Sequence, residues 1–275
     1  MLSFFAGIIL YNPTQNNIQN IIEYEKGFDK VIVFDNSDNG KNNAEYFEKE
    51  KWIYHKAQKN EGISTAINYM LDLCSENHVD FLCTLDQDSI FDLESIHILK
   101  EYISNNLRTD IAIYAPRIDY LNRKQRVEKN LISEREWVIT SGNFINIKIV
   151  REKAIKYDES YFIDRCDRDF CMQITKMNLK IVVNNQAVLC QPLGALEENG
   201  RMGHSALRHY YCFRNRFYYN AKYYTGVEKW SRNAVQTIRQ IGMILLKESD
   251  KYNKIRMLYK AINDYKKGRM GMYGK

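Results

Sequence analysis

The sequence has few of the residues that interrupt or cross-link a chain. Its 275 residues include only 3 prolines and 13 glycines, and no segment is repeated or of low complexity, which argues against long disordered linkers. The 6 cysteines never form a CxxC pair, so neither a zinc site nor a redox motif is indicated. No run approaches the roughly 18 apolar residues of a membrane span. What remains is a globular chain, long enough for one large domain or for one domain with an appendage.

The amino-terminal segment is apolar, but no basic residues precede it. It leads directly into Tyr11-Asn12-Pro13, whose composition is typical of a turn. We therefore interpret residues 4–10 as a first core strand and not as a signal peptide. With no expected membrane span, the sequence predicts a cytoplasmic protein.

Charge is distributed unevenly along the chain. Residues 201–275 contain 17 Lys and Arg against 4 Asp and Glu, whereas residues 1–200 contain 23 against 30, and ten of the 20 tyrosines also lie in 201–275. A basic region suits nucleic acid, an anionic membrane or a phosphorylated substrate, and aromatic rings beside basic residues favour the headgroup region of a bilayer. We expect a peripheral protein that meets an anionic membrane surface, at the inner face of the cell membrane, and no nucleic acid partner.

Strand and helix patterns alternate over the first 120 residues, which predicts an α/β fold: a mixed, mostly parallel sheet with helices on both faces. The expected strands are 4–10, 31–34, 52–54, 81–85, 111–115, 137–147, 180–183 and 187–190, with a surface loop over 122–136. The expected helices are 62–74, 93–103, 149–156, one beginning near Asp167, 205–224, 228–247 and 250–267. This pattern predicts a first domain over 1–204 and a basic, Tyr-rich helical extension over 205–275 packed on it.

The most informative motif is the segment 81–89, an apolar run that ends in Asp86 and Asp88 with Gln87 between them. In an open α/β sheet, ligands bind beyond the carboxyl ends of the strands, so both acids lie where a nucleotide and its metal ion are expected. Carboxylates suit Mg2+ or Mn2+, which commonly bridge one or two acids to substrate phosphates. The alternative is a strand followed by an acidic turn.

Several segments, in this order, resemble the nucleotide-sugar-dependent family 2 glycosyltransferases of the GT-A fold, and within them the bacterial rhamnosyltransferase-like branch. The matching segments are Tyr11-Asn12-Pro13, Asp35-Asn36-Ser37, Asn60 with Gly62-Ile63 through Asn68, Leu85 to Ser89, Phe162-Ile163-Asp164, Asp167 to Phe170, and Arg208 with Tyr210-Tyr211 and Arg214-Asn215. The resemblance implies a Rossmann-like nucleotide-diphospho-sugar transferase and an inverting, metal-dependent enzyme.

By this resemblance, Asp88 is the direct ligand of a Mn2+ or Mg2+ ion held against the donor diphosphate, and Asp86 contacts the ribose, the metal or a metal-bound water. The resemblance assigns the donor pocket to Tyr11, Asn12, Pro13, Asp35, Asn36, Asn60, Gly62, Asn68, Asp86 and Gln87. Two of these residues have open alternatives. Asp35 also suits a turn or a helix cap, and Asn68 also suits a hydrogen-bonded interior amide.

Inversion at a sugar carbon by single displacement requires a base that removes the proton of the acceptor hydroxyl. The resemblance places this base at Asp167, with Asp169 as the second candidate. Asp164 shares their helical face if the helix begins early. A structural helix cap is the alternative for each of these three acids.

The chain departs from the resembled family at one point. Relatives commonly have a histidine before a Leu-Gly pair, whereas this chain has Gln191 in the segment Leu189-Cys190-Gln191-Pro192-Leu193-Gly194. Either the acids, the diphosphate and water hold the metal, or His204 joins them from the following loop. A structural role is the alternative for His204.

Arg208, Tyr211 and Asn215 are spaced three and four residues apart, so they share one face of an expected helix, with Arg214 beside them. Their donor groups suit phosphate. We expect this set to bind the donor diphosphate or the phosphate of a lipid-linked acceptor. The alternative is a helix with core aromatics and solvated arginines.

The resulting hypothesis is a transferase that moves a sugar from a dTDP- or UDP-sugar, with rhamnose suggested by the branch, onto a glycan or lipid-linked acceptor of bacterial surface polysaccharide. Two other classes remain as alternatives. A glycoside hydrolase would use paired carboxylates without nucleotide or metal. A non-catalytic module would use only the basic region, on membrane or nucleic acid.

Overall fold

The computed structural model of the chain describes residues 1–274 apart from 39–41, 122–129, 193–194 and 197–201. The chain divides into two compact units. The sheet unit comprises Met1–Asp158 and Asp167–Pro192, and the helical unit comprises Glu159–Cys166 and Leu193–Lys275. Residues 159–166, which precede the Asp167 segment, thus belong with the carboxyl-terminal helices.

The described residues of the sheet unit form one mixed sheet of nine strands, in the order β3-β2-β1-β4-β8-β6-β9-β5, with β7 paired to β9. The strands are β1 Phe4–Leu10, β2 Lys30–Asp35, β3 Trp52–Lys56, β4 Phe81–Asp86, β5 Ile90–Phe91, β6 Ile111–Tyr120, β7 Ile132–Glu134, β8 Asn143–Asn146 and β9 Lys180–Gln191. The neighbours β3, β2, β1 and β4 are all parallel, whereas β8 runs antiparallel to β4 and β6. The carboxyl ends of these four parallel strands therefore meet at one edge.

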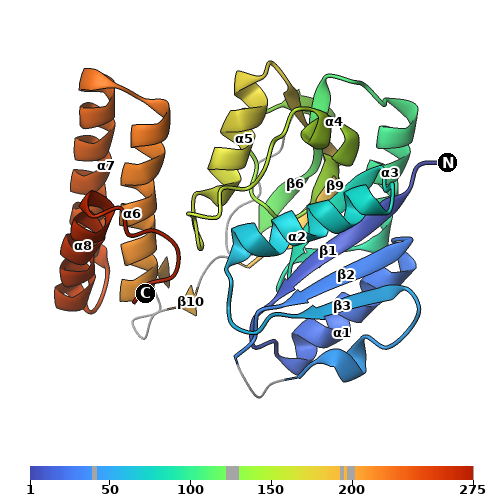
Figure 1. The fold of residues 1–275 in the computed structure, drawn as a ribbon, viewed down its shortest axis with the longest axis horizontal. Helices are drawn as coiled ribbons and strands as arrows, with labels where there is room; N and C mark the ends of the chain where they lie inside the picture. The colour runs from blue at the N-terminus through green and yellow to red at the C-terminus, as the bar shows by residue number, and fades with distance from the viewer. Residues whose placement is uncertain (39–41, 122–129, 193–194, 197–201, 275) are drawn as a thin grey trace. The chain divides into compact units, whose positions relative to one another are not determined.

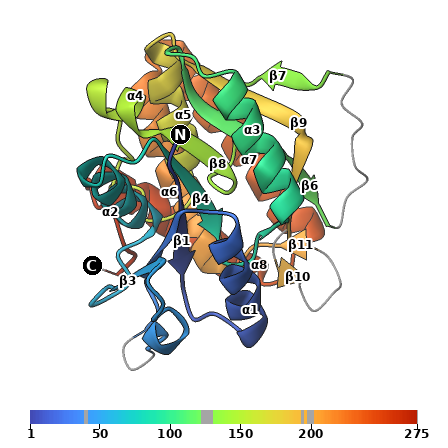
Figure 2. The same cartoon turned by 90° about the vertical axis from the view of Figure 1, so that its right-hand side faces the viewer.

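Helices cover both faces of this sheet, as the alternating pattern predicts. They are α1 Gln15–Glu23, α2 Ile63–Glu76, α3 Leu93–Asn105, α4 Ile147–Glu152 and α5 Cys166–Lys176. The side chains of Ala6 and Ile8 in β1 share a core with α1 and α3. On the opposite face, Met70 of α2 approaches Gly7 so closely that a Cβ there would lie 2.6 Å from its sulfur. Figure 2 shows α2 and α3 on opposite sides of the strands.

Three parts of the expected pattern differ in the structure. Residues 137–142 do not continue the strand predicted over 137–147, because Gly142 has a φ of 86° and its N–H donates to the Thr84 carbonyl oxygen at 2.7 Å. The strands predicted over 180–183 and 187–190 are one strand, β9, which continues through a bulge opposite Pro116 and Arg117. Part of the expected surface loop over 122–136 forms β7, and residues 122–129 lie outside the described residues.

Gly142 is expected to be intolerant of a side chain. A Cβ would lie 2.7 Å from Pro116 Cγ and 2.9 Å from Leu189 Cδ1, and the positive φ adds backbone strain. Gly142→Ala should therefore lower the free energy of unfolding by about 3 kcal/mol, measured by urea denaturation. Gly242→Ala is the matched control, since a Cβ there meets no described atom within 4 Å beyond its chain neighbours and the adjoining backbone of its own helix, and alanine favours that helix by ~1 kcal/mol. Equal effects of the two substitutions would contradict the close packing at Gly142.

The described residues of the helical unit form three helices, α6 Ala206–Tyr223, α7 Gly226–Lys247 and α8 Lys251–Lys266, and a two-stranded antiparallel sheet of β10 Ala195–Leu196 and β11 Met202–Gly203. Figure 1 shows the three helices side by side. Their core contains Tyr210 and Phe213 of α6, Ile244 of α7, and Leu258 of α8. Among the described residues, no helix combines the length and the apolar character needed to cross a membrane.

A buried polar network joins these three helices. The carboxylate of Glu248 accepts a hydrogen bond from Lys254 Nζ at 2.9 Å and lies 2.7 Å from His209 Nε2, whose other ring nitrogen contacts Gln240 at 2.8 Å. Burial alone raises the pKa of Glu248, but the hydrogen bonds to Lys254 and His209 outweigh it and hold this pKa below its ordinary value. Glu248 is therefore an ionised acceptor within the helical unit.

Candidate functional site

The candidate site begins where three parallel strands end. Leu10 of β1 pairs with Asp35 of β2, and Ile9 pairs with Asp86 of β4, so the segments that follow these strands emerge together. Such carboxyl ends of adjacent parallel strands are the usual ligand-binding edge of an open sheet. The structure therefore brings the three sequence motifs at residues 11–13, 35–37 and 86–88 to one edge.

Gln87 links two of these motifs directly. Its side-chain oxygen accepts from the backbone N–H of Tyr11 at 2.8 Å, and its amide nitrogen donates to the Tyr11 carbonyl oxygen at 3.2 Å. The Gln87 carbonyl oxygen also accepts from Asn17 of α1 at 3.2 Å. This paired contact fixes the turn after β1 beside the two acids. It places both flanking carboxylates, partly exposed Asp86 and exposed Asp88, at the sheet edge.

A second set of hydrogen bonds ties the turn after β1 to the turn after β2. The N–H of Asn12 donates to Ser37 Oγ at 2.8 Å, and its side-chain amide donates to Asp38 at 2.7 Å. Asn12 has a φ of 48°, a left-handed conformation that asparagine tolerates better than most residues. The two turns therefore form one polar rim.

Asp35 is fully buried at the end of β2. Its carboxylate accepts from the Ser37 N–H at 2.8 Å, from Asn43 at 2.8 Å and from the Tyr54 hydroxyl at 2.6 Å, and Lys56 Nζ lies 3.5 Å away. Burial alone raises its pKa, but the hydrogen bonds from Ser37, Tyr54 and Asn43 outweigh it and hold the pKa below its ordinary value. Asp35 is thus an ionised acceptor, and a nucleotide that bonded to it would replace one of these partners.

Asn36 connects the β2 end to the turn before α2. Its amide oxygen accepts from the Glu61 N–H at 2.9 Å, and its amide nitrogen donates to the Gly62 carbonyl oxygen at 3.2 Å. Asn60 accepts from the Gly62 N–H at 3.0 Å, and Gly62 has a φ of 86°, which favours glycine. The Asn60 to Gly62 turn therefore adjoins the same edge.

Asn68 lies further along α2 and has a different environment. Its buried side chain donates to the Tyr157 carbonyl oxygen at 2.9 Å and accepts from the Tyr157 N–H at 3.0 Å. These hydrogen bonds match the alternative role of Asn68, that of a hydrogen-bonded interior amide. They join α2 to the segment after α4.

A serine pair holds the acidic turn in place. Ser141 Oγ accepts from the Asp86 N–H at 3.1 Å and lies 2.6 Å from Ser89 Oγ, and both serines are fully buried. Ser89 in turn donates to the Gln191 side-chain oxygen, and the Gln191 amide nitrogen donates to Asp88 Oδ1 at 3.3 Å. Gln191, at the position where the resembled relatives commonly have histidine, is therefore hydrogen-bonded to the carboxylate of Asp88.

The first turn of α5 contains Asp167 and Asp169 in different environments. Asp169 is fully buried and accepts from Gln173 at 2.8 Å, whereas Asp167 is partly exposed and accepts from the Arg168 N–H at 2.8 Å. Acids at this position are favoured by the helix dipole.

The segment 137–141 connects α5 with the end of β4. The Arg168 guanidinium lies 3.8 Å from the centre of the Trp137 ring, and the Thr140 carbonyl oxygen accepts from Thr84 of β4 at 2.6 Å. Together with the hydrogen bond between Ser141 and Asp86, these contacts connect the first turn of α5 to the acidic motif.

The remaining predicted residues belong to the helical unit. Asp164, with a φ of 65°, pairs with Arg208 at 3.1 Å and contacts Cys212 Sγ at 3.5 Å. His204 is exposed, and its ring centre lies 5.8 Å from that of His209.

The expected phosphate-binding face of α6 is largely internal to that unit. Arg214 is buried and donates to the Gly271 carbonyl oxygen at 2.7 Å, and Asn215 donates to the Ile163 carbonyl oxygen at 2.7 Å. The Tyr211 hydroxyl accepts from the Tyr273 N–H at 2.9 Å. Arg208 is the member of the set whose side chain reaches solvent, at 46% exposure.

Several residues of the site were not predicted from the sequence. Asn43 and Tyr54 bond to Asp35, and Ser141 holds the acidic turn together with Ser89, which belongs to the predicted motif. Tyr54 has a signal in the sequence, because it lies in the strand expected over 52–54 beside the Asp35 strand. Ser141 has none, since it falls within a stretch expected to be a strand.

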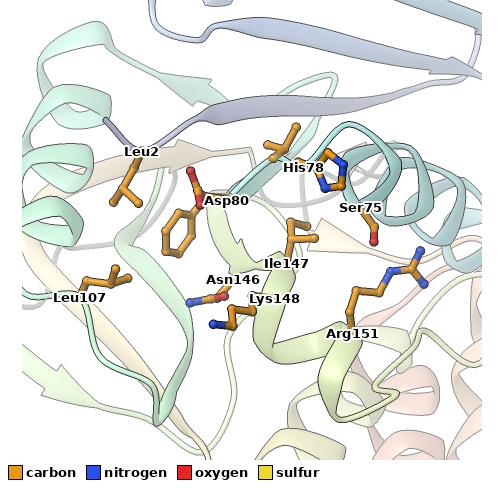
Figure 3. A pocket seen from close by; sticks show the side chains of 11 residues that line it. Leu2, Ser75, His78, Asp80, Leu107, Asn146, Ile147, Lys148 and Arg151 are labelled. Atoms are coloured by element: carbon orange, nitrogen blue, oxygen red, sulfur yellow. The ribbon is translucent and has the colours of Figure 1, made fainter.

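A cavity of about 330 Å3 lies at the opposite end of β4 (Figure 3), where its lining includes Asp80, His78 and Arg151. Asp80 accepts from the Ser3 N–H at 2.8 Å, and Arg151 pairs with Asp72 at 2.6 Å. Because this cavity adjoins the amino ends of the parallel strands, we do not assign it to the candidate site.

Within the described residues, no three His, Cys, Asp or Glu side chains are grouped so as to hold a metal ion. At the sheet edge, Asp86 and Asp88 form a pair of carboxylates that could hold such an ion. Mg2+ is usually bound through one or two carboxylates together with substrate phosphates, so this donor set fits a hard divalent ion that also binds a diphosphate.

Solved structures with the same architecture define the class of this fold. S. aureus TarS 1-349 in complex with UDP-GlcNAc matches with a TM-score of 0.61 and 14% identity, over 96% of this chain and 80% of that chain. S. aureus TarS 1-349 alone matches with a TM-score of 0.58 and 12% identity, over 98% and 83% of the two chains. S. aureus TarS matches with a TM-score of 0.55 and 13% identity, over 95% of this chain and 43% of that chain. The predicted GT-A fold with a carboxyl-terminal helical part is confirmed.

The family follows from the sequence. The model of glycosyl transferase family 2 matches residues 8–166, more than half of the chain, and the chain therefore belongs to that family. The matched range contains the turns after β1 and β2, the acidic motif and the segment that leads into α5. No curated protein sequence matches the chain.

Proposed function

We propose that this protein is an inverting glycosyltransferase that uses a nucleoside-diphosphate sugar as its donor. The observation that carries this proposal is the paired contact of Gln87 with the Tyr11 backbone, which holds two partly or fully exposed carboxylates beside the polar turns after β1 and β2. This arrangement suits a ligand with a nucleoside at one end and a diphosphate at the other. The complex of S. aureus TarS with UDP-GlcNAc supports a donor of this class.

The nucleoside would bind at the β2 end. Asp35, Asn36 and the Asn60 to Gly62 turn surround this part of the edge with acceptors and donors. The proposed nucleobase of the donor is uracil or thymine, and rhamnose is the proposed sugar if the nucleotide is dTDP. Tyr11, Asn12 and Pro13 would form the wall of the donor pocket next to Asp86 and Asp88.

The donor diphosphate would bind at Asp86 and Asp88. Mn2+ or Mg2+ held there would supply neutralisation of the charge that develops as the nucleoside diphosphate departs. Asp88 is the proposed direct ligand, because it is exposed and Gln191 orients it. Asp86 is the proposed partner at the ribose or at a metal-bound water, and His204 remains a candidate ligand from the helical unit.

Asp167 is the proposed base. Its carboxylate would accept the proton of the acceptor hydroxyl while the acceptor oxygen bonds to the sugar carbon and the bond from that carbon to the diphosphate breaks. Asp167 is partly exposed, whereas buried Asp169 is bonded to Gln173 and Asp164 is paired with Arg208. These contacts favour Asp167 over the other two acids.

The proposed acceptor is a saccharide or a lipid-linked glycan of bacterial surface polysaccharide. Arg208, with Tyr211, Arg214 and Asn215 behind it in α6, is the proposed contact for a phosphate of donor or acceptor. We further propose that the reaction takes place at the anionic inner face of the cell membrane, which the basic charge of residues 201–275 favours.

The test is calorimetric titration of UDP and of dTDP into the full chain, with and without Mn2+, and with ADP as the control nucleotide. We expect metal-dependent binding of UDP or dTDP and weaker binding of ADP, because the purine would not fit a pyrimidine pocket. The tighter of the two pyrimidine nucleotides identifies the donor. Absence of binding by both would contradict the proposed reaction.

A further inference from the structure

Helix α7 packs against α6 through polar side chains. Arg216 of α6, which is 3% exposed, donates to Thr237 Oγ1 at 2.8 Å and to the Gln240 side-chain oxygen at 2.7 Å. Asn220, also buried, donates to Asn233 at 2.7 Å. At about 100° per residue, these three α7 partners fall on one side of the helix. The covered side of α7 is therefore polar over most of its length, with Ile244 in the apolar core near its carboxyl end.

The opposite side of α7 is exposed and carries large apolar side chains, with Glu228, Ser231 and Arg239 also on this side. Five large apolar side chains on this side are between 48% and 81% exposed, and they are Val227, Val235, Ile238, Leu245 and Leu246. We call these five residues the outer stripe. Val227, Ile238 and Leu245 are in line along the helix, and the roughly 18 steps of about 1.5 Å from the first to the last span about 27 Å.

This polarity is the reverse of that expected for a helix on the surface of a soluble protein, whose apolar side faces the core. A contiguous group of exposed, large apolar side chains is typical of an interaction site. The inner hydrogen bonds fix the orientation of α7, because rotating the helix to bury the outer stripe would leave Arg216 buried without these partners. The exposure of the stripe is therefore built into the packing of the helical unit.

The charge of the surrounding surface selects the partner. Of the four acids in residues 201–275, Glu248 and Asp264 are buried, which leaves Glu228 and Asp250 at the surface against many exposed Lys and Arg side chains. Arg232 and Arg239 border the outer stripe, seven residues apart. A second copy of this basic unit would be repelled, whereas anionic lipid would be attracted.

Aromatic side chains support the same partner. Trp230, one turn after Val227, borders the outer stripe and is 72% exposed, and Tyr252 and Tyr259 of α8 are each 78% exposed. Trp and Tyr are enriched where a polar ring atom meets the headgroups and the ring meets the acyl chains. Exposed aromatics beside basic residues on an amphipathic helix are typical of helices that lie in the membrane interface.

We propose that α7 lies in the surface of an anionic bilayer, with the outer stripe inserted between the lipid headgroups and acyl chains. This inference deepens the membrane location given above and rests on it, but it does not depend on the transfer reaction. The helix lies along the membrane and does not cross it.

The test compares sedimentation of the full chain with phosphatidylcholine vesicles that do or do not contain phosphatidylglycerol. We expect binding to the anionic vesicles that weakens with added salt. Ile238→Gln combined with Leu245→Gln should lower the partition coefficient at least about tenfold, since each removes a large apolar side chain from the lipid. Leu121→Gln combined with Leu131→Gln, at exposed leucines of the sheet unit, is the matched control and should change nothing.

Insertion has its own measurement. Brominated lipid should quench tryptophan fluorescence, and Trp230→Phe should remove most of that quenching. Titration of the same variants with UDP and dTDP tests the nucleotide site separately. A variant that loses vesicle binding but still binds nucleotide has lost only the membrane contact of α7. Equal partition of the stripe variant and the parent would overturn the inference. The inference would also be overturned if sedimentation velocity showed that the parent protein is a dimer and the stripe variant a monomer. The outer stripe would then contact a second copy of the chain.

Discussion

Asp167→Asn is expected to lower transferase turnover by about 10²–10⁴-fold, the usual contribution of a general base, while nucleotide affinity stays unchanged. Asparagine has nearly the same shape as aspartate but cannot accept the acceptor proton. The measurement is the release of nucleoside diphosphate from the sugar donor whose nucleotide binds more tightly, with water as the acceptor. Calorimetric titration of the same variant with that nucleotide separates turnover from binding.

Asp169→Asn and Asp164→Asn are the comparison variants. Asp169 is buried and bonded to Gln173, so its substitution should lower thermal stability more than turnover. Asp164→Asn removes the ion pair with Arg208 and should leave turnover within a few-fold of the parent. If Asp169→Asn lost turnover in a folded protein and Asp167→Asn retained it, the base would be Asp169.

The sheet edge of the candidate site could be predicted from the sequence because its signals are local. Within an alternating α/β pattern, an apolar run followed by Asp86 and Asp88 indicates a buried strand that ends at the ligand-binding edge, and β4 indeed ends at Asp86. The bonds that arrange the site are not local. Gln87 joins residue 11, and Ser89 joins residues 141 and 191, at separations where no spacing rule applies.

In the helical unit, too, the sequence predicts the helices but not the long-range contacts of their side chains. Residues 208, 211 and 215 share a helical face, as their spacing predicts, but periodicity does not tell which way a face points. Arg214 and Asn215 turn toward the segments at residues 271 and 163, which lie far away in sequence. Helix α7 was expected from its pattern, and only the structure shows that its polar side is covered and its apolar side exposed.

Asp88→Asn is expected to remove the Mn2+ dependence of nucleotide binding and to lower turnover by about 10³-fold, because charge neutralisation at the leaving diphosphate is worth several kcal/mol. Titration with UDP or dTDP should then give the same affinity with and without Mn2+. Gln191→Leu should have a smaller effect. It removes the amide that donates to Asp88 Oδ1, and loss of such an outer partner typically lowers metal affinity by about 10–100-fold.

Asp110→Asn provides the surface control for both variants, since Asp110 forms an exposed ion pair with Arg108 and should contribute neither to metal binding nor to turnover. The order of effects is informative. A loss of Mn2+ dependence in Asp88→Asn, a partial loss in Gln191→Leu and none in Asp110→Asn would place the ion at the carboxylate that Gln191 orients. Unchanged Mn2+ dependence in Asp88→Asn would instead remove Asp88 from the metal site and leave the Gln191 contact with a purely structural role.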